Sequence, residues 1–173
     1  MKQTLKYIYD RLEEQLRYAE TKHSISITLA SALTVFSATY LDSSTPLINA
    51  LSAISIIFSL VSVLYSFLAL SAKKVHFGKT KKRVEDKSSN PNLLYYKEIS
   101  FFSPEDYVAR VASVYPLFKG YKPDAFDLDL SRQVVATSKT IYSKFLLFNF
   151  ALTFLILSLF CESAVIILKG LLT

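Results

Sequence analysis

Charged side chains are missing from three long stretches of this chain. No Asp, Glu, Lys or Arg occurs in residues 24–41, 43–72 or 145–161. A helix that crosses a bilayer needs about 20 apolar residues, at about 1.5 Å of rise per residue. The pattern therefore predicts three membrane spans, at residues 24–41, 47–70 and 145–168. The first is the shortest and the most polar, because Ser and Thr recur through it.

Apolar residues before the first span follow helical spacing. Through residues 1–23 they recur every three or four positions, at Leu5, Ile8, Leu12, Leu16 and Ala19. This spacing predicts an amphipathic helix that leads into the first span. After the second span, the polar stretch 79–92 predicts a linker, and the short apolar and aromatic pieces in 93–102 predict loop-like or extended structure.

Two helix starts follow in the same segment. Ser103 is placed as an N-cap, with Pro104 at the first helical position and an acid at the third. The apolar face of this helix is predicted to be Tyr107, Val111, Val114 and Phe118, with Gly120 placed to end it. The second start is at Asp124, with Asp127 three residues on, and no helix breaker comes before Gly170. We expect one long helix to run from there through the third span.

These elements predict an all-α membrane protein with three transmembrane helices. An N-terminal amphipathic helix (1–23) precedes a transmembrane hairpin (24–71), a small, mostly helical sensing or linker segment (72–144) and the third span (145–168). Orientation follows Lys and Arg near the span ends. Residues 1–23 hold five of these, the turn at 42–46 none, residues 73–144 fourteen, and the tail only Lys169. The N-terminus and residues 72–144 are therefore expected in the cytoplasm.

The basic run at 79–83 fits anionic lipid headgroups better than a nucleic-acid polymer, because it directly follows a span. The chain has one cysteine, Cys161, inside the third apolar stretch, and three glycines that lie far apart. Neither a disulfide framework, a Cys/His metal site nor a phosphate-binding glycine loop is expected. Carboxylates at Asp124, Asp127 and Asp129 are explained by the helix dipole. We expect no catalytic residue, no metal and no cofactor.

Serines form a regular pattern in the second span. Ser52, Ser55, Ser59, Ser62 and Ser66 alternate spacings of three and four residues and so share one helix face. Such a seam lets helices approach closely and hydrogen-bond across the contact. Two interpretations stay open. The seam either packs against another span of the same chain, or it brings several copies together in a homo-oligomer.

Several short motifs resemble a known family. Ala19-Glu20-Thr21-Lys22 before the first span resembles a motif at the same place in the Pycsar transmembrane effectors, although Glu20 replaces the usual Asp and His23 a small residue. The stretch from Asn92 through Tyr95 and Tyr96, followed by Ser103-Pro104-Glu105-Asp106-Tyr107, is similar to that family's Asn-plus-aromatic stretch and helix start. Gln133 and Lys144 sit where the family tends to carry a Gln and a Lys. The likeness covers residues 15–160.

The resemblance implies a bacterial anti-phage effector of the inner membrane. Such proteins are thought to respond to a cyclic pyrimidine mononucleotide, cyclic CMP or cyclic UMP, and then to impair the membrane. On this hypothesis the ligand lies between the end of the N-terminal helix and residues 92–107. Lys22, His23 and Lys144 would meet its phosphate beside Glu20 and Asn92, and Tyr95 or Tyr96 would stack on its base. The alternative is a membrane scaffold that recruits a soluble partner through residues 92–122.

Overall fold

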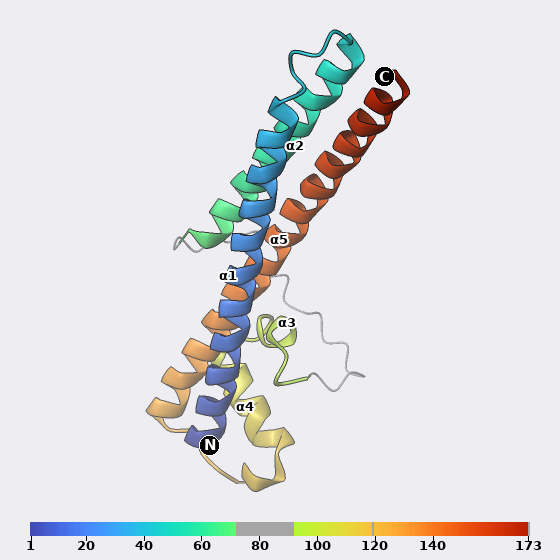
Figure 1. Cartoon of the computed structure of the whole chain (residues 1–173). Coiled ribbons are helices and arrows are strands. Elements are labelled where there is room, and N and C mark those ends of the chain that lie inside the picture. The colour runs from blue at the N-terminus through green and yellow to red at the C-terminus, as the bar shows by residue number, and fades with distance from the viewer. Residues whose placement is uncertain (72–91, 119, 173) are drawn as a thin grey trace. The chain divides into compact units, whose positions relative to one another are not determined.

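Most of the part of the chain that the structure describes is helical. The computed structural model describes residues 1–71, 92–118 and 120–172 and is 85% helix, with no strand in these residues (Figure 1). Its elements are α1 (Lys2–Ala38), α2 (Pro46–Leu70), α3 (Tyr96–Ile99), α4 (Pro104–Val114), the short 3-10 helix η1 (Pro116–Phe118) and α5 (Ala125–Leu172). The all-α prediction is confirmed. The basic cluster at 73–83 and the predicted linker, apart from Asn92, lie outside the described residues.

The chain divides into two compact units. Unit 1 comprises Met1–Ala19 and Lys74–Ser143, and unit 2 comprises Glu20–Lys73 and Lys144–Thr173. The helices α1 and α5 contribute their first parts to unit 1 and their second parts to unit 2. The single long helix predicted from Asp124 onward is confirmed as α5, which continues through Glu162 and past Gly170 to Leu172.

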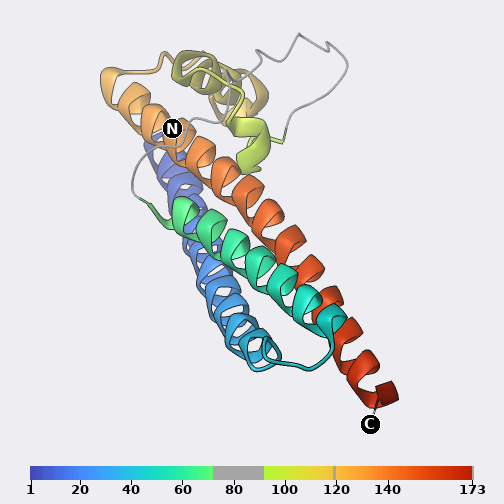
Figure 2. The same cartoon turned by 90° about the horizontal axis from the view of Figure 1, so that it is seen from above.

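Unit 2 consists of three helical segments that lie side by side in both views of the ribbon (Figures 1 and 2). They are the second part of α1, all of α2, and the second part of α5. The helices α2 and α5 are long and apolar enough to cross a bilayer, as predicted for the second and third spans. The helix α1 ends at Ala38, short of the predicted 41, and is not one of these two candidates. Its run of Ser and Thr lowers its hydropathy.

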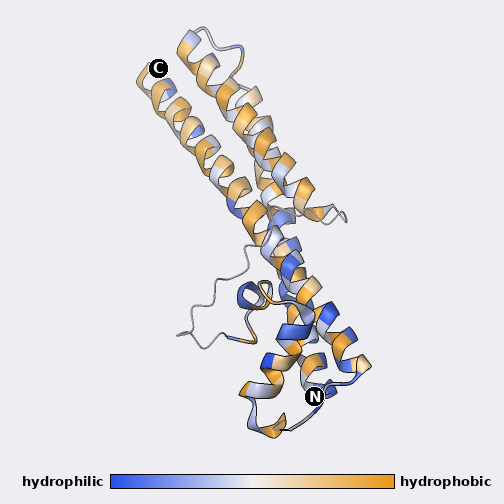
Figure 3. Cartoon of the chain, turned by 180° about the vertical axis from the view of Figure 1, so that it is seen from behind, coloured by the Kyte–Doolittle hydropathy of each residue, from blue (hydrophilic) through white to orange (hydrophobic). Residues whose placement is uncertain are grey.

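Unit 2 buries many polar side chains beside apolar ones such as Leu147 and Val165, and it exposes many large apolar ones. Only 28% of the most apolar stretch of α2, and of α5, is buried. Ile57, Leu64 and Phe67 of α2 are each 57% exposed, whereas the buried residues of α2 include five serines. Figure 3 shows hydrophobic residues along these helices and the hydrophilic ones gathered in unit 1. This arrangement is the reverse of a water-soluble core.

Unit 1 has an apolar core built from α1, α4 and the first part of α5. Its fully buried side chains include Leu5, Ile8, Leu12, Ile99, Tyr107, Val111, Val134 and Ile141. The predicted cap of α4 is confirmed, because Ser103 Oγ accepts the backbone N–H of Asp106 at 3.0 Å and Pro104 occupies the first turn. The predicted amphipathic stripe of residues 1–23 is buried except Leu16, which is partly exposed.

Two predictions for residues 93–120 were wrong. Residues Tyr96–Ile99 form the single helical turn α3 rather than loop-like structure. The helix α4 ends at Val114, which is 38% exposed, so the buried face is Tyr107, Val108 and Val111. Pro116 causes the early end, because it forces the preceding Tyr115 out of the helical region, to φ −89° and ψ 115°. Phe118 is buried in η1 instead, and Gly120 follows at φ 83°, where other residues are strained.

Candidate functional site

A hydrogen-bonded group of polar side chains lies inside unit 2, around Ser55. Its Oγ lies 2.9 Å from Ser37 Oγ on α1 and 2.9 Å from Ser158 Oγ on α5. Ser59 Oγ lies 2.7 Å from the same Ser158 hydroxyl. All four serines are fully buried. Each of the three helices in unit 2 therefore supplies a hydroxyl to one hydrogen-bonded chain.

Glu162 stands at the end of this chain of hydroxyls. One carboxylate oxygen, Oε1, accepts a hydrogen bond from Ser37, and the side chain is only 3% exposed. The other oxygen, Oε2, has no hydrogen-bond partner among the residues that the structure describes. Glu162 directly follows the charge-free stretch 145–161. An acidic side chain in this setting is rare, and such residues mark functional positions in membrane proteins.

The serine seam of α2 faces the other helices of its own unit. All five of its members are fully buried, and Ser62 Oγ donates to the backbone carbonyl of Ala151 on α5 at 2.8 Å. In the described part of the chain, the hydroxyls of Ser52 and Ser66 have no hydrogen-bond partner. Of the two interpretations of the seam, these contacts match packing within one chain.

A second polar cluster of unit 2 joins α1 to α5. Lys144 Nζ lies 2.8 Å from Glu20 Oε1, and His23 Nε2 donates to the backbone carbonyl of Lys144 at 3.0 Å. Because a carbonyl oxygen only accepts, the proton of neutral His23 sits on Nε2. Lys22 Nζ lies over the rings of Phe145 and Phe148, at 5.3 and 5.2 Å from their centroids. The structure thus brings together the four candidate site residues near the predicted start of the first span.

These contacts affect the pKa of His23 and the ability of Lys144 to bind another anion. Burial, the largest influence, lowers the pKa of His23 below its ordinary value, and the Lys144 charge acts in the same direction. The hydrogen bond to the Lys144 carbonyl opposes this shift. His23 is therefore held neutral near pH 7. Lys144 already has an acidic partner in Glu20, so a phosphate would have to compete with that carboxylate.

The other three candidate site residues belong to unit 1. Asn92 Oδ1 accepts the backbone N–H of Leu94 at 3.0 Å, which shapes the turn before α3. The rings of Tyr95 and Tyr96 pack edge to face with their centroids 4.8 Å apart, and Tyr95 is 40% exposed. Burial raises the pKa of Tyr96 to about 12, so its hydroxyl stays neutral and able to donate.

Unit 1 also holds a small open pocket next to this turn. It is lined by Tyr7, Ile8, Arg11 and Gln15 of α1 and by Leu94. The Arg11 guanidinium lies 5.9 Å from the centroid of the Tyr7 ring. Gln15 Oε1 is buried and has no hydrogen-bond partner in the described part of the chain. A cation, an aromatic face and an amide are the groups that recognise an anionic ligand with a flat ring.

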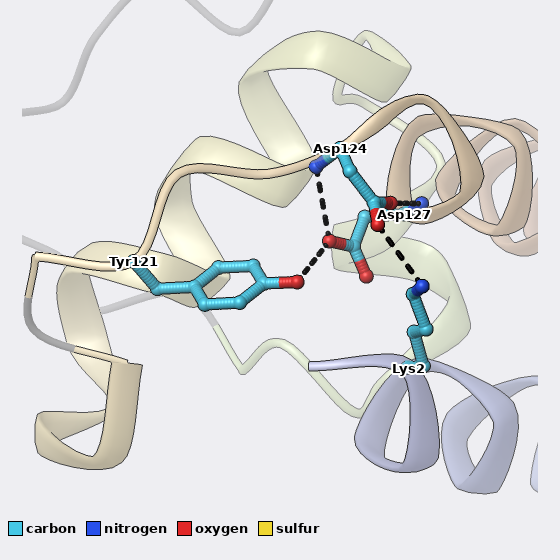
Figure 4. A network of polar contacts seen from close by, with 4 residues as sticks. All are labelled: Lys2, Tyr121, Asp124 and Asp127. Carbon is cyan, nitrogen blue, oxygen red and sulfur yellow. Dashed lines mark hydrogen bonds and ion pairs between the residues drawn. The ribbon is translucent and has the colours of Figure 1, made fainter.

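The acidic residues at the start of α5 form a helix cap (Figure 4). The backbone N–H of Asp127 donates to Asp124 Oδ1 at 2.9 Å, and that of Asp124 donates to Asp127 Oδ2 at 3.2 Å. The Tyr121 hydroxyl donates to Asp127 at 2.6 Å, which raises the pKa of Tyr121 to about 12. Lys2 Nζ lies 3.0 Å from Asp124. No group of three or more potential metal ligands occurs among the described His, Cys, Asp and Glu residues.

Sequence reasoning found part of this arrangement. It singled out the serines of α2 and the residues Glu20, Lys22, His23 and Lys144. It missed Ser37 and Ser158, because neither belongs to a regular seam of serines like the one on α2. It also missed the pocket at Arg11, whose lining comes from α1 and from a turn far along the chain.

Comparisons with known proteins identify one family. The family model described as the Pycsar effector protein domain matches residues 4–170 of this chain. Searches of curated proteins and of solved structures found no match.

Proposed function

Because the chain belongs to the Pycsar effector family of antiviral membrane effectors, we propose that it senses a cyclic nucleotide in the cytoplasm and impairs the inner membrane. This response would stop the growth of the infected cell or kill it before phage replication ends. The proposed effector acts without catalysis. The observation that carries the membrane part is the reversed polarity of unit 2, with buried serines and Glu162 inside and apolar residues outside.

We assign three spans to unit 2, with residues 24–41 as the first. In α1, the exposed side chains Ile25, Leu29 and Val35 are 55%, 51% and 70% exposed, as in a helix that faces lipid. The same helix buries Ser26 and Ser37. The distribution of Lys and Arg supports a cytoplasmic N-terminus and cytoplasmic residues 72–144. The segments 1–23, 24–71, 72–144 and 145–168 then act as amphipathic helix, transmembrane hairpin, sensing part and third span.

Unit 1 is the proposed sensing part. Its pocket offers Arg11 for a phosphate and the Tyr7 ring for a base. The Gln15 oxygen, which has no partner among the described residues, is available for a base amino group. Tyr95 and Tyr96 follow directly after Leu94, which lines the pocket. The motif residue Asn92 supports the turn that places Leu94. In unit 2, Lys22, His23 and Lys144 with Glu20 are a second proposed phosphate-responsive group.

Membrane action is proposed to involve several copies of the chain. If the helices of unit 2 separated, the serine hydroxyls of α2 would become available to other copies. Ser52 and Ser66 have no partner in the described part of the chain even before such a separation. Polar faces inside lipid favour association, because the alternative is an unsatisfied hydroxyl in hydrocarbon. Homo-oligomers along this seam would let water and ions cross.

The membrane action is tested by dye entry into living cells. The wild-type chain is induced with its candidate nucleotide, and propidium uptake is followed beside a Ser55→Leu, Ser59→Leu, Ser62→Leu variant. We expect uptake with the wild-type chain and a loss of most of it in the variant. Leu60→Ala, at a position that is 54% exposed on α2, is the matched control and should retain uptake. Equal uptake in all three chains would limit the seam to packing.

Nucleotide sensing is tested by isothermal titration. Purified chain in detergent and in nanodiscs is titrated with cyclic CMP, cyclic UMP and cyclic dinucleotides. We expect heat with a cyclic pyrimidine mononucleotide, and a loss of binding of about tenfold or more when Arg11→Ala removes a charge-assisted contact. Arg132→Ala, which removes an exposed cation paired with Asp129, is the control. The absence of heat with every nucleotide would end this part of the proposal.

A further inference from the structure

The hydroxyl chain of unit 2 has more acceptors than protons. The single proton of Ser37 faces three acceptors, namely the Leu33 carbonyl at 2.8 Å, Ser55 Oγ at 2.9 Å and Glu162 Oε1. Each serine supplies only one hydroxyl proton. Even when every hydroxyl donates toward Glu162, its second oxygen receives nothing in the described part of the chain. A buried carboxyl group in this state needs either a proton or a cation to balance its charge.

We propose that Glu162 together with Ser37, Ser55 and Ser158 forms a binding site for a monovalent alkali cation, Na⁺ or K⁺. The site gathers a carboxylate, three hydroxyls and backbone carbonyls, all of them hard oxygen ligands. The carbonyl of Ser158 lies 3.3 Å from Ser55 Oγ, and that of Ser55 lies 3.2 Å from Ser158 Oγ. These oxygens come from α1, α2 and α5, so one bound cation would link all three helices of unit 2.

The charge of the site selects a monovalent cation. Glu162 is the one carboxylate in this hydroxyl chain, and one negative charge balances one positive charge. Ca²⁺ and Mg²⁺ sites in proteins usually employ more than one carboxylate, and no group of three candidate His, Cys, Asp or Glu ligands occurs in the described part of the chain. Burial in unit 2 also removes water that would otherwise satisfy the carboxylate. A cation that replaces this water stabilises the folded unit.

This inference goes beyond the proposed membrane action and requires neither nucleotide binding nor membrane damage. Full-length chain in nanodiscs is treated with dicyclohexylcarbodiimide, an apolar reagent that reacts with protonated carboxyl groups in apolar surroundings. Mass spectrometry then measures the modified fraction of Glu162. We expect modification in choline chloride and protection by NaCl or KCl. At ten times the dissociation constant, mass action leaves about a tenth of the sites open to the reagent.

Two variants and a control test the ligands. Ser55→Ala removes one hydroxyl and should raise the protecting salt concentration about tenfold. Glu162→Gln retains the shape of the side chain but loses the charge. The wild-type Tm in detergent should rise when NaCl or KCl replaces choline chloride, and the variant should show no such rise. Ser163→Ala is the control, because Ser163 is exposed and donates to Leu159 of its own helix, so wild-type protection should persist.

Modification of Glu162 at the same rate in all salts would overturn the proposal and leave a site that holds only a proton. If Glu162 is not modified in any salt, the Tm decides. A Tm that does not respond to NaCl or KCl, or that responds equally in Glu162→Gln, would also overturn it. None of these results bears on propidium uptake or on nucleotide titration.

Discussion

The helix α1 runs through both units and buries a different kind of side chain in each. In unit 1, α1 buries Leu5, Ile8 and Leu12, and in unit 2 the same helix buries Ser26 and Ser37. The helix α5 does not change in this way, because it buries Ser131 beside Val134 in unit 1 and Glu162 beside Val165 in unit 2. Burial of apolar residues is driven by water, and burial of hydroxyls is favoured where the surroundings are hydrocarbon. The change along α1 is what the proposed first span at residues 24–41 would produce.

The polar side chains of the two units also make different kinds of contact. In unit 1 Ser103 and Asp124 cap helices, and Ser131 of α5 donates to the Pro104 carbonyl in the first turn of α4. In unit 2 the polar side chains lie within the helices and join one helix to another through Ser37, Ser55 and Ser158. A helix in lipid has no hydrophobic force toward its neighbour, so small residues and hydroxyls supply the contact.

The largest expected effect comes from a lysine on the exposed face of unit 2. A lysine on the exposed face of unit 1 is the comparison. Ile57→Lys on α2 should reduce insertion into membranes, because a lysine near the centre of a span costs about 2.5–3.5 kcal/mol. Leu117→Lys in unit 1, where the leucine is 85% exposed, should change the free energy of unfolding by less than about 0.5 kcal/mol. Membrane fractionation and thermal unfolding measure the two effects. Ile57→Val is the control. If both lysines are tolerated equally, the exposed face of unit 2 does not contact lipid.

A smaller effect is expected at the cap of α4. Ser103→Ala leaves the backbone N–H of Asp106 without its acceptor and should lower the free energy of unfolding of unit 1 by about 1 kcal/mol. Ser113→Ala is the control, because this exposed hydroxyl donates to Arg110 of its own helix. Urea unfolding of the purified chain measures both. A cap effect no larger than the control would show that the start of α4 depends on packing alone.

The smallest effect is expected from pH at the start of α5. The backbone N–H of Asp127, and then Lys2, lower the pKa of Asp124 below its ordinary 3.8. Ionised Asp124 therefore stabilises unit 1 above pH 3.8, and this stability is lost as pH falls through the lowered pKa. In Lys2→Met the drop in Tm from about pH 5 to about pH 2 should be smaller than in the wild-type chain. Lys6→Met is the control. An equal drop in all three chains would contradict a role for this ion pair.

Local signals along the chain predicted much of the fold. The N-cap at Ser103 and the start of α5 near Asp124 were predicted correctly, because each depends on residues within one helical turn. The end of α4 was predicted wrongly, because the apolar spacing through Phe118 outweighed the restriction that Pro116 places on Tyr115. The single turn α3 was missed for a related reason. Four residues are too few to show a helical period.

The candidate sites show the same difference between residues that share one helix and residues that meet from different helices. The five serines of α2 share one helix, so their spacing alone predicted a common face, and all five are buried. Glu162 directly follows the charge-free stretch 145–161, but nothing in the sequence connected it to Ser37 on another helix. Lys144 was expected to meet a phosphate. That role stays a prediction, and in the structure the Lys144 Nζ lies 2.8 Å from Glu20 Oε1.

The sequence by itself determined where this chain is apolar, where its helices start, and which family it belongs to. Charge, capping and periodicity are properties of neighbouring residues, so they can be read directly along the chain. Only the tertiary structure decided that Ser37, Ser55, Ser158 and Glu162 meet, since they come from three different helices. It also decided that the serine seam faces inward, because a helix face has no direction until its neighbours are placed.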